Sequence, residues 1–239
     1  MRDSGQFNYH LDKLCPGFVR KHEDGYELTH AGKQVIGAAV SGTYTETDVT
    51  VDAIDVSDCW QCEGRIELRY DRGYLIVECS DCEVVVTDGL AAPPVVAATH
   101  DGEELAEVFN QLLLDRLQTM HRGFCLLCGG VTEKSLGSDA DVQNTDELLI
   151  HAECSACGNE WFSSVGTEIL DHPGVVEFLY QHGIDIRKTP VWEYHWLAEL
   201  DADILQEEPL RIQVVVELPD DRLELQLDDT FDVVEFERP

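Results

Sequence analysis

Eight of the nine cysteines occur in four Cys-x-x-Cys pairs, and these pairs carry the clearest chemistry in the chain. Sixteen residues separate the first pair from the second, and twenty-five separate the third from the fourth. Each pair can place two thiolates on one tetrahedral ion, so two consecutive pairs close a structural zinc site. The sequence therefore predicts two structural Zn²⁺ ions, with the ligands Cys59, Cys62, Cys79 and Cys82 for one and Cys125, Cys128, Cys154 and Cys157 for the other.

Two questions about the cysteines stay open at the level of sequence. Four disulfides are the alternative to two metal ions, but no secretion signal opens the chain, and this favours a reducing compartment. The spacing does not decide whether each ion is held within one set of four or shared between the sets. The ninth cysteine, Cys15, is predicted to be a small buried residue.

The predicted metal sites do not indicate catalysis. Four thiolates saturate tetrahedral zinc and leave no position for an activated water. His121 and His151 lie close in sequence to Cys125 and Cys154, and we expect surface or neighbouring side chains there rather than further ligands. The chain has no nucleophile elbow, glycine-rich phosphate loop or His-Glu zinc-protease motif. We therefore predict that the protein is not an enzyme.

Short strands flank both sets of cysteines. In residues 56–89 the segments "RIELRY", "YLIVEC" and "EVVVTDG" surround a turn at residues 71–73, and in residues 123–166 the segments "VTEKSL", "ELLIHAEC" and "EWFSSV" surround a polar loop. Three antiparallel strands that carry two cysteine knuckles are typical of a zinc ribbon. The sequence predicts two zinc ribbons built on one plan.

A helix is predicted between the ribbons, over residues 101–122. Its apolar side chains recur at helical spacing, which predicts one apolar face; they are Leu105, Val108, Phe109, Leu112, Leu113 and Leu117. This face is interpreted as the core that joins the two ribbons. The alternative is a homodimer interface of a regulator that binds a two-fold site.

Residues 172–239 are predicted to form a short helix followed by an antiparallel meander. "PGVVEFLYQHG" gives the helix, and "LRIQVVVEL", "RLELQL" and "FDVVEFER" give three strands. Between this helix and the first of the three strands, Trp192, Tyr194 and Trp196 alternate with other residues, which predicts a further strand with an aromatic stripe. The stripe is interpreted as core, with a ligand pocket as the alternative.

The first 44 residues read as helix, hairpin, helix. "DSGQFNYHLDKL" places Phe7, Leu11 and Leu14 on one apolar stripe and polar side chains elsewhere. "FVRKHEDGYELT" then predicts two strands around a tight turn, and Thr29 is a predicted cap for a second helix. This order of elements is that of the second half of a winged helix.

These residues resemble the ArsR-like winged-helix regulators of salt-loving archaea. In that family a "DSGxFNYHLDKL" recognition helix precedes a "GYxLTxAG" wing and helix, and similar regulators carry "HPxVVxFxxxHGxDxxxxPxWE" behind a cysteine-rich domain. The resemblance implies that the segment binds double-stranded DNA. It places in the major groove Ser4, Gln6, Asn8, Tyr9, His10 and Lys13, and along the phosphates Arg20, Lys21 and His22.

The winged helix of this sequence is partial. The family normally supplies two or more helices before the recognition helix, and here only Met1 and Arg2 precede it. Because about 40 residues cannot bury much of a core alone, either the natural coding sequence begins upstream or this segment packs on the rest of the chain or on a partner. We expect the first, and we expect DNA binding to require the completed unit. The predicted fold class is α+β, with a partial winged-helix domain over residues 1–44 and a double zinc-ribbon domain over residues 45–239.

Charge separates these two regions. The chain has 48 acidic and 16 basic residues among 239, a net charge of −32, yet residues 1–44 hold five of each sign. Such an acid excess with 44% hydrophobic content indicates a folded protein suited to concentrated salt. No apolar run is long enough to cross a membrane, so a cytoplasmic location is predicted. We expect a transcriptional regulator; the alternative is a zinc-stapled protein-interaction module that does not bind DNA.

Overall fold

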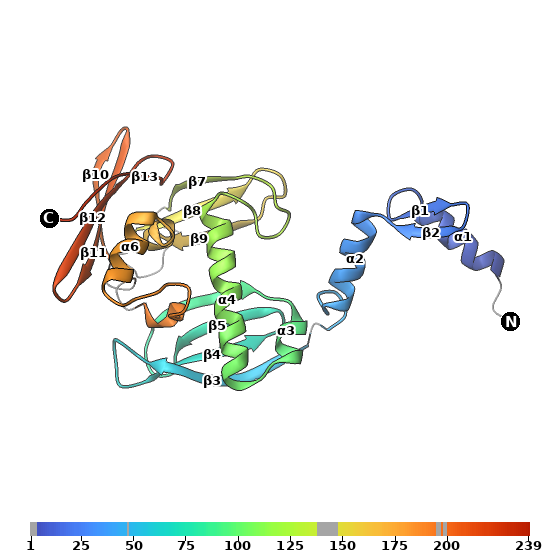
Figure 1. The fold of residues 1–239 in the computed structure, drawn as a ribbon, viewed down its shortest axis with the longest axis horizontal. Coiled ribbons are helices and arrows are strands. Elements are labelled where there is room, and N and C mark those ends of the chain that lie inside the picture. Colours follow the sequence, from blue (N-terminus) through green and yellow to red (C-terminus); the bar gives the residue numbers. More distant parts are fainter. Residues whose placement is uncertain (1–3, 47, 138–147, 195–196, 198–199) are drawn as a thin grey trace.

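The computed structural model describes residues 4–46, 48–137, 148–194, 197 and 200–239. Its strands form four sheets, of two, four, three and four strands in chain order, and every strand pair is antiparallel. Helices lie between and beside these sheets (Figure 1). The mixed α and β composition and the antiparallel pairing agree with the prediction.

The N-terminal unit, residues 4–44, has the predicted order of elements. Helix α1 (Ser4–Leu14) is followed by the hairpin of β1 (Val19–His22) and β2 (Gly25–Leu28), and then by α2 (His30–Val40). In Figure 1 this unit stands apart from the larger body, and α2 leads from one to the other.

Close backbone packing joins α2 to the hairpin. The hydroxyl oxygen of Thr29 accepts the amide of Gly32 at 3.1 Å, which is the predicted N-cap. A Cβ on Gly32 would lie 2.2 Å from the carbonyl oxygen of Phe18, so only glycine permits this approach. Val19 is buried at the same place.

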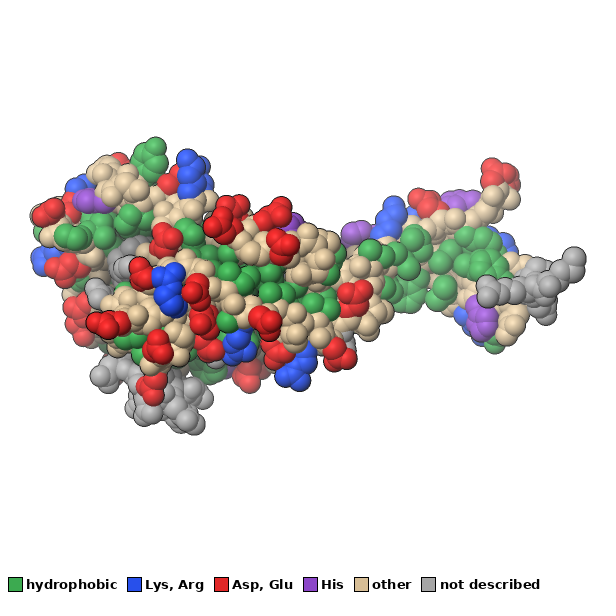
Figure 2. Space-filling view, turned by 90° about the horizontal axis from the view of Figure 1, so that it is seen from below, with side chains coloured by type: hydrophobic (Ala, Val, Ile, Leu, Met, Phe, Trp, Pro, Cys, Tyr) green, Lys and Arg blue, Asp and Glu red, His purple; other side chains and the backbone are tan. Residues whose placement is uncertain are grey.

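The N-terminal unit leaves most of its apolar side chains in contact with solvent. Exposed large residues in it include Phe7, Leu14, Phe18, Val35, Ile36, Val40 and Tyr44. The space-filling view shows hydrophobic side chains gathered on this unit and acidic side chains scattered over the body (Figure 2). The unit therefore has little core of its own, as expected for so short a segment.

The first ribbon is a four-stranded sheet. Its order is β3 (Thr50–Asp58), β4 (Arg65–Asp71), β5 (Tyr74–Cys79) and β6 (Val85–Ala91). The last three strands were predicted, and β3 is an additional edge strand. It escaped prediction because aspartates at every third position, Asp52, Asp55 and Asp58, break the alternation that marks a strand.

Two helices follow this sheet, α3 (Pro94–Thr99) and α4 (Gly102–His121). The ring of Phe109 on α4 stacks on Tyr70 of β4, with 5.7 Å between ring centroids. Leu105, Phe109 and Leu113 are buried, as the core interpretation of this helix predicted. Helix α4 extends from the first ribbon towards the second (Figure 1).

The second ribbon is a three-stranded sheet of β7 (Thr132–Leu136), β8 (Leu149–Cys154) and β9 (Glu160–Ser164). All three strands were predicted. Most of the polar loop between β7 and β8 lies outside the described residues. Two short helices come next, α5 (Val165–Ile169), which was not predicted, and α6 (Pro173–Gln181), which was.

The aromatic segment after α6 does not form the predicted strand. Val191–Glu193 is a single turn of 3₁₀ helix, in which the Val191 amide donates to Asn110 Oδ1 at 2.9 Å instead of to a neighbouring strand. Trp192 and Tyr194 are each 2% exposed, so the core interpretation is correct for both. Trp196 lies outside the described residues.

The C-terminal sheet has the order β10 (Asp201–Glu207), β11 (Leu210–Leu218), β12 (Asp221–Leu227) and β13 (Val233–Glu237). The predicted meander corresponds to its last three strands. Alternate residues of β11 and β12 are buried, namely Ile212, Val214, Val216, Leu223, Leu225 and Leu227. This two-residue period is the pattern from which the strands were predicted.

Candidate metal centres and nucleic-acid interface

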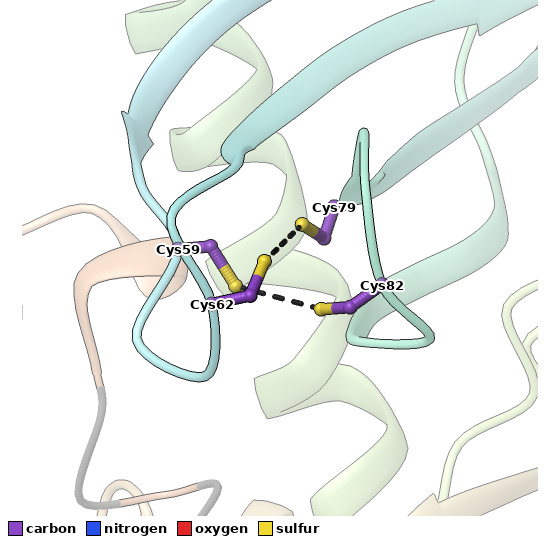
Figure 3. A group of neighbouring side chains, drawn as sticks. All are labelled: Cys59, Cys62, Cys79 and Cys82. Carbon is purple, nitrogen blue, oxygen red and sulfur yellow. Dashed lines mark hydrogen bonds between the residues drawn. The ribbon is translucent and has the colours of Figure 1, made fainter.

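The first cysteine tetrad converges at one end of the first ribbon. Cys59 and Cys62 come from the loop between β3 and β4, Cys79 ends β5, and Cys82 lies in the turn before β6 (Figure 3). The Sγ atoms of Cys59 and Cys82 are 3.7 Å apart, and those of Cys62 and Cys79 are 3.5 Å apart. All four sulfurs lie within 4.8 Å of one another, so they can hold one metal ion.

Backbone amides point at these sulfurs. The Gly64 amide donates to Cys62 Sγ at 3.3 Å, and the Asp81 amide donates to Cys79 Sγ at 3.4 Å. The hydrogen bond from Asp81 is the largest influence on Cys79 and lowers the pKa of this thiol to about 7. Because a metal ligand must be the thiolate, the Asp81 amide favours the form of Cys79 that binds a metal. At Cys62 the Gly64 amide acts in the same direction, but burial and the other three thiols raise the pKa of this cysteine to about 12.

The second tetrad repeats this geometry in the second ribbon. The Sγ atoms of Cys125 and Cys157 are 3.7 Å apart, and those of Cys128 and Cys154 are 3.5 Å apart. The Ala156 amide lowers the pKa of Cys154 to about 7. These four sulfurs also lie within 4.8 Å of one another.

The two tetrads settle both questions that the spacing left open. Sulfur separations of 3.5 to 3.7 Å exceed the roughly 2.05 Å of a disulfide, and all cysteines are free thiols. Each set of four ligands comes from a single ribbon. The predicted ligand sets are therefore brought together, whereas Cys15, which was predicted to be buried, is only half-buried.

Neither histidine near the knuckles joins a tetrad among the described residues. His151 Nε2 lies 3.1 Å from Glu160 Oε2, and its ring stacks on Phe162 at 4.8 Å. His121 instead belongs to a group of charged residues beside the second ribbon, which the sequence analysis did not identify.

This charge cluster consists of His121, Lys134, Glu168 and Asp171. The Glu168 carboxylate is 2% exposed and accepts from Lys134 Nζ at 2.5 Å and from His121 Nδ1 at 2.9 Å. His121 Nε2 lies 3.2 Å from Asp171 Oδ1. The cluster ties α4, β7 and α5 together. The sequence gives one indication of this cluster: Glu168 is the single charged residue in the run "SSVGTEIL", and a lone acid among such residues can be buried with a partner.

The charge cluster predicts a pH dependence of stability. The hydrogen bond to Glu168 raises the pKa of His121 above its usual value, with Asp171 acting in the same direction and Lys134 against it. Since the folded state holds this proton more tightly, its contribution is complete below about pH 6.5 and is lost as the pH rises through the raised pKa. We expect the free energy of unfolding of the wild type to fall across this range, by at most about 1.4 kcal/mol per pH unit.

Urea unfolding of the wild type and of His121→Gln at several pH values between about 6 and 9 measures this effect. Burial lowers the pKa of the neighbouring His172, so the contribution of His172 to stability increases as the pH rises. The contribution of His121 is therefore taken from the difference between the pH profiles of the wild type and His121→Gln. Parallel pH profiles for the two proteins would contradict this prediction.

The residues of α1 predicted to contact bases are exposed wherever their side chains are described, and most of them share one face of the helix. Gln6, Tyr9, His10 and Lys13 recur at helical spacing and lie on one side. Asn8 is two residues from both Gln6 and His10, a rotation of about 200° that brings it to the side of Leu11. The side chain of Ser4 lies outside the described part of the chain.

The three predicted phosphate contacts lie on β1, and all are exposed. Lys21 Nζ is 3.6 Å from Asp12 Oδ1 and 5.5 Å from the ring centroid of Tyr26. His22 Nε2 is 3.4 Å from Glu27 Oε2. For Arg20 the described residues provide no ion pair. These contacts are at the surface, where ion pairs are weak, so the basic groups stay available to another anion.

Two family models match separate parts of the chain. A domain of unknown function, DUF7347, matches residues 1–39, and a second domain of unknown function, DUF7351, matches residues 56–233. No curated protein and no solved structure matches the chain. Within the described residues, no helix is both long and apolar enough to cross a membrane. Because the DUF7351 model covers more than half of the sequence, the chain belongs to the DUF7351 family.

Proposed function

We propose that the protein is a DNA-binding transcriptional regulator whose larger domain is held together by two structural zinc ions. The observation that carries this proposal is the exposed face of α1, where Gln6, Tyr9, His10 and Lys13 stand together. Side chains of these types can donate to and accept from base edges in the major groove. The neighbouring β1 adds basic side chains that suit phosphate contacts.

The distribution of charge supports the same proposal. Residues 1–44 are neutral in sum, so the rest of the chain carries the whole net charge of −32. An acidic body repels the DNA backbone, and the N-terminal unit is the part of the protein where this repulsion is weakest. The N-terminal unit stands apart from the body (Figure 1), and the residues of the α1 face are exposed.

Sulfur geometry supports zinc as the metal. Four thiolates at about 2.3 Å from a tetrahedral Zn²⁺ are about 3.8 Å from one another, close to the 3.5 and 3.7 Å separations in both tetrads. A site made only of thiolates is typical of structural zinc and leaves no open position. We therefore infer a structural role for both ions and no catalytic one.

Lys13→Ala tests the DNA-binding proposal. We expect it to weaken binding to a mixed pool of labelled 30-base-pair DNA and to reduce the preference among sequences, because the resemblance places Lys13 in the major groove. Loss of its charge should also lower the slope of log affinity against log potassium concentration, by at most about 1. Gln6→Ala is expected to leave that slope unchanged and to alter the preference among sequences. Fluorescence anisotropy over a series of potassium concentrations measures both effects.

Lys188→Ala is the matched control, because it removes the same charge from a side chain of the body that is 84% exposed. We expect it to leave affinity and salt slope unchanged. Because DNA binding is expected to require the completed winged helix, the measurements are made on this chain and on a version extended at its N-terminus by the helices that complete the unit. No binding by either protein, or equal losses from Lys13→Ala and Lys188→Ala, would rule out α1 as a DNA-binding helix.

A protein-interaction module that does not bind DNA is the second candidate. The apolar side chains exposed on the N-terminal unit favour it, in particular Phe7, Val35, Ile36 and Val40. Exposed apolar patches of this kind are typical of surfaces that other proteins cover. If this candidate is correct, the chain should self-associate in sedimentation experiments and show no DNA binding, and Val40→Asp should abolish the association.

A further inference from the structure

A cavity of about 250 Å³ lies between α4 and the segments around α5 and residue 186. Its wall includes part of the charge cluster, but most of its lining belongs to no site described above. The lining residues are Gln111, Leu114, Asp115, Leu117, Gln118, His121, Thr167, Leu170, Asp171, Ile186 and Arg187. Pockets for drug-sized ligands span about 300–1,000 Å³, so this cavity suits a smaller molecule.

One part of the cavity lining is aliphatic. Leu114 and Leu117 project from α4, and Leu170 and Ile186 come from the opposite side. Leu170 and Ile186 are buried, and the two leucines of α4 are half-buried. These four side chains offer a ligand apolar contact without any polar group to satisfy.

The charged groups of the lining differ in whether they already have partners. His121 and Asp171 contact each other and belong to the charge cluster. No ion pair or side-chain hydrogen bond to the Asp115 carboxylate occurs within the described part of the chain. The Arg187 side chain is 81% exposed and donates from Nε to Asp185 Oδ1 at 3.2 Å, and within the described residues its two terminal nitrogens make no hydrogen bond or ion pair. The cavity thus presents one anion and one cation that can bind a ligand.

Asp115 and Arg187 lie near each other at the cavity. Gln111 Nε2 donates to the carbonyl oxygen of Arg187 at 3.4 Å, which holds that residue against α4. Asp115 is four residues beyond Gln111 on the same helix face, a rise of about 6 Å. Asp115 and Arg187 therefore both line the cavity, together with the aliphatic side chains.

We propose that this cavity binds a small zwitterion with an aliphatic body, of the class of the aliphatic L-amino acids. The ammonium group binds Asp115, the carboxylate binds the terminal nitrogens of Arg187, and the side chain covers the leucines and Ile186. A ligand with only one charge leaves either Asp115 or Arg187 without its partner, so both charges are needed for full affinity. The proposal concerns the larger domain and is independent of DNA binding.

Isothermal titration of the full chain with L-leucine tests the proposal, at the lowest salt that keeps the protein folded. Isocaproate and isopentylamine are the comparison ligands, because each keeps the aliphatic body of leucine and one of its two charges. We expect L-leucine to bind and each comparison ligand to bind at least about tenfold more weakly, since each loses one charge-assisted contact.

Two variants assign the contacts. We expect Asp115→Asn and Arg187→Gln each to weaken L-leucine binding at least about tenfold, and Asp115→Asn to leave isocaproate binding unchanged. Glu107→Gln is the matched control, since Glu107 is an exposed acid of α4 outside the cavity. All three positions are at the surface, so circular dichroism should show the same fold in each. No binding of L-leucine, equal binding of the three ligands, or unchanged affinity in both variants would overturn the proposal.

Discussion

Replacing Cys79 with serine should remove one of two zinc ions per chain and unfold the first ribbon. Apparent binding free energies of structural zinc in small domains are about 10–16 kcal/mol, which matches or exceeds the 5–15 kcal/mol that stabilises a typical domain. Cys79 is also buried in the hydrophobic core together with Ile66, its partner in the register of β4 and β5. Loss of the ion therefore removes a support of the core itself.

Elemental analysis of the purified protein and denaturant unfolding measure this result. The wild type should contain close to two zinc ions, Cys79→Ser close to one, and the variant should lose the cooperative unfolding transition of the first ribbon. Cys15→Ser is the matched control, because Cys15 is a free thiol outside both tetrads. A wild type with nine reactive thiols and no metal would contradict the assignment, and iron in place of zinc would contradict the choice of metal.

Replacing Lys134 with methionine should destabilise the protein by about 3–5 kcal/mol, because it leaves a buried charge without its cation. Glu168 is 2% exposed, and Lys134 Nζ is its nearest partner at 2.5 Å. His121 can compensate below its raised pKa, where it is protonated. The loss should therefore be largest at high pH, and urea unfolding at about pH 9 measures it.

Two further variants separate charge from packing at this position. Lys188→Met removes a lysine whose side chain is 84% exposed, and it should cost no more than about 1 kcal/mol. The double variant Lys134→Met, Glu168→Leu removes both charges, and it should recover most of the lost stability. If Lys134→Met costs less than about 1 kcal/mol at high pH, the buried pair does not have the role assigned to it.

Local patterns were enough to predict most of the strands and helices. In β4, β5, β11 and β12 buried residues alternate regularly with residues that are mostly half-buried, so the period itself identified the strand. The two unpredicted strands, β3 and β10, are edge strands with most residues exposed. An edge strand is stabilised by its one neighbour, and its sequence need not alternate.

The strand predicted around Trp192 was wrong for a different reason. Its alternating aromatic residues have the period of a strand, but the chain there is held by a side chain from another element, Asn110 of α4. A contact between residues 81 positions apart leaves no mark in the local pattern. Tertiary contacts override local preference at such places.

The sequence by itself determined the eight metal ligands and the strands that carry them, because the spacing of Cys-x-x-Cys pairs and the two-residue period are local properties. Only the tertiary structure decided that the four sulfurs of each candidate metal site come from one ribbon, because the spacing alone permits other pairings of the knuckles. The contacts of Lys134, His121 and Asp171 in the charge cluster around Glu168 were also visible only in the tertiary structure. The same holds for the presence of Arg187 and Asp115 in the lining of one cavity. Contacts of that kind depend on how separate elements pack, and this follows from the burial of apolar surface over the whole chain.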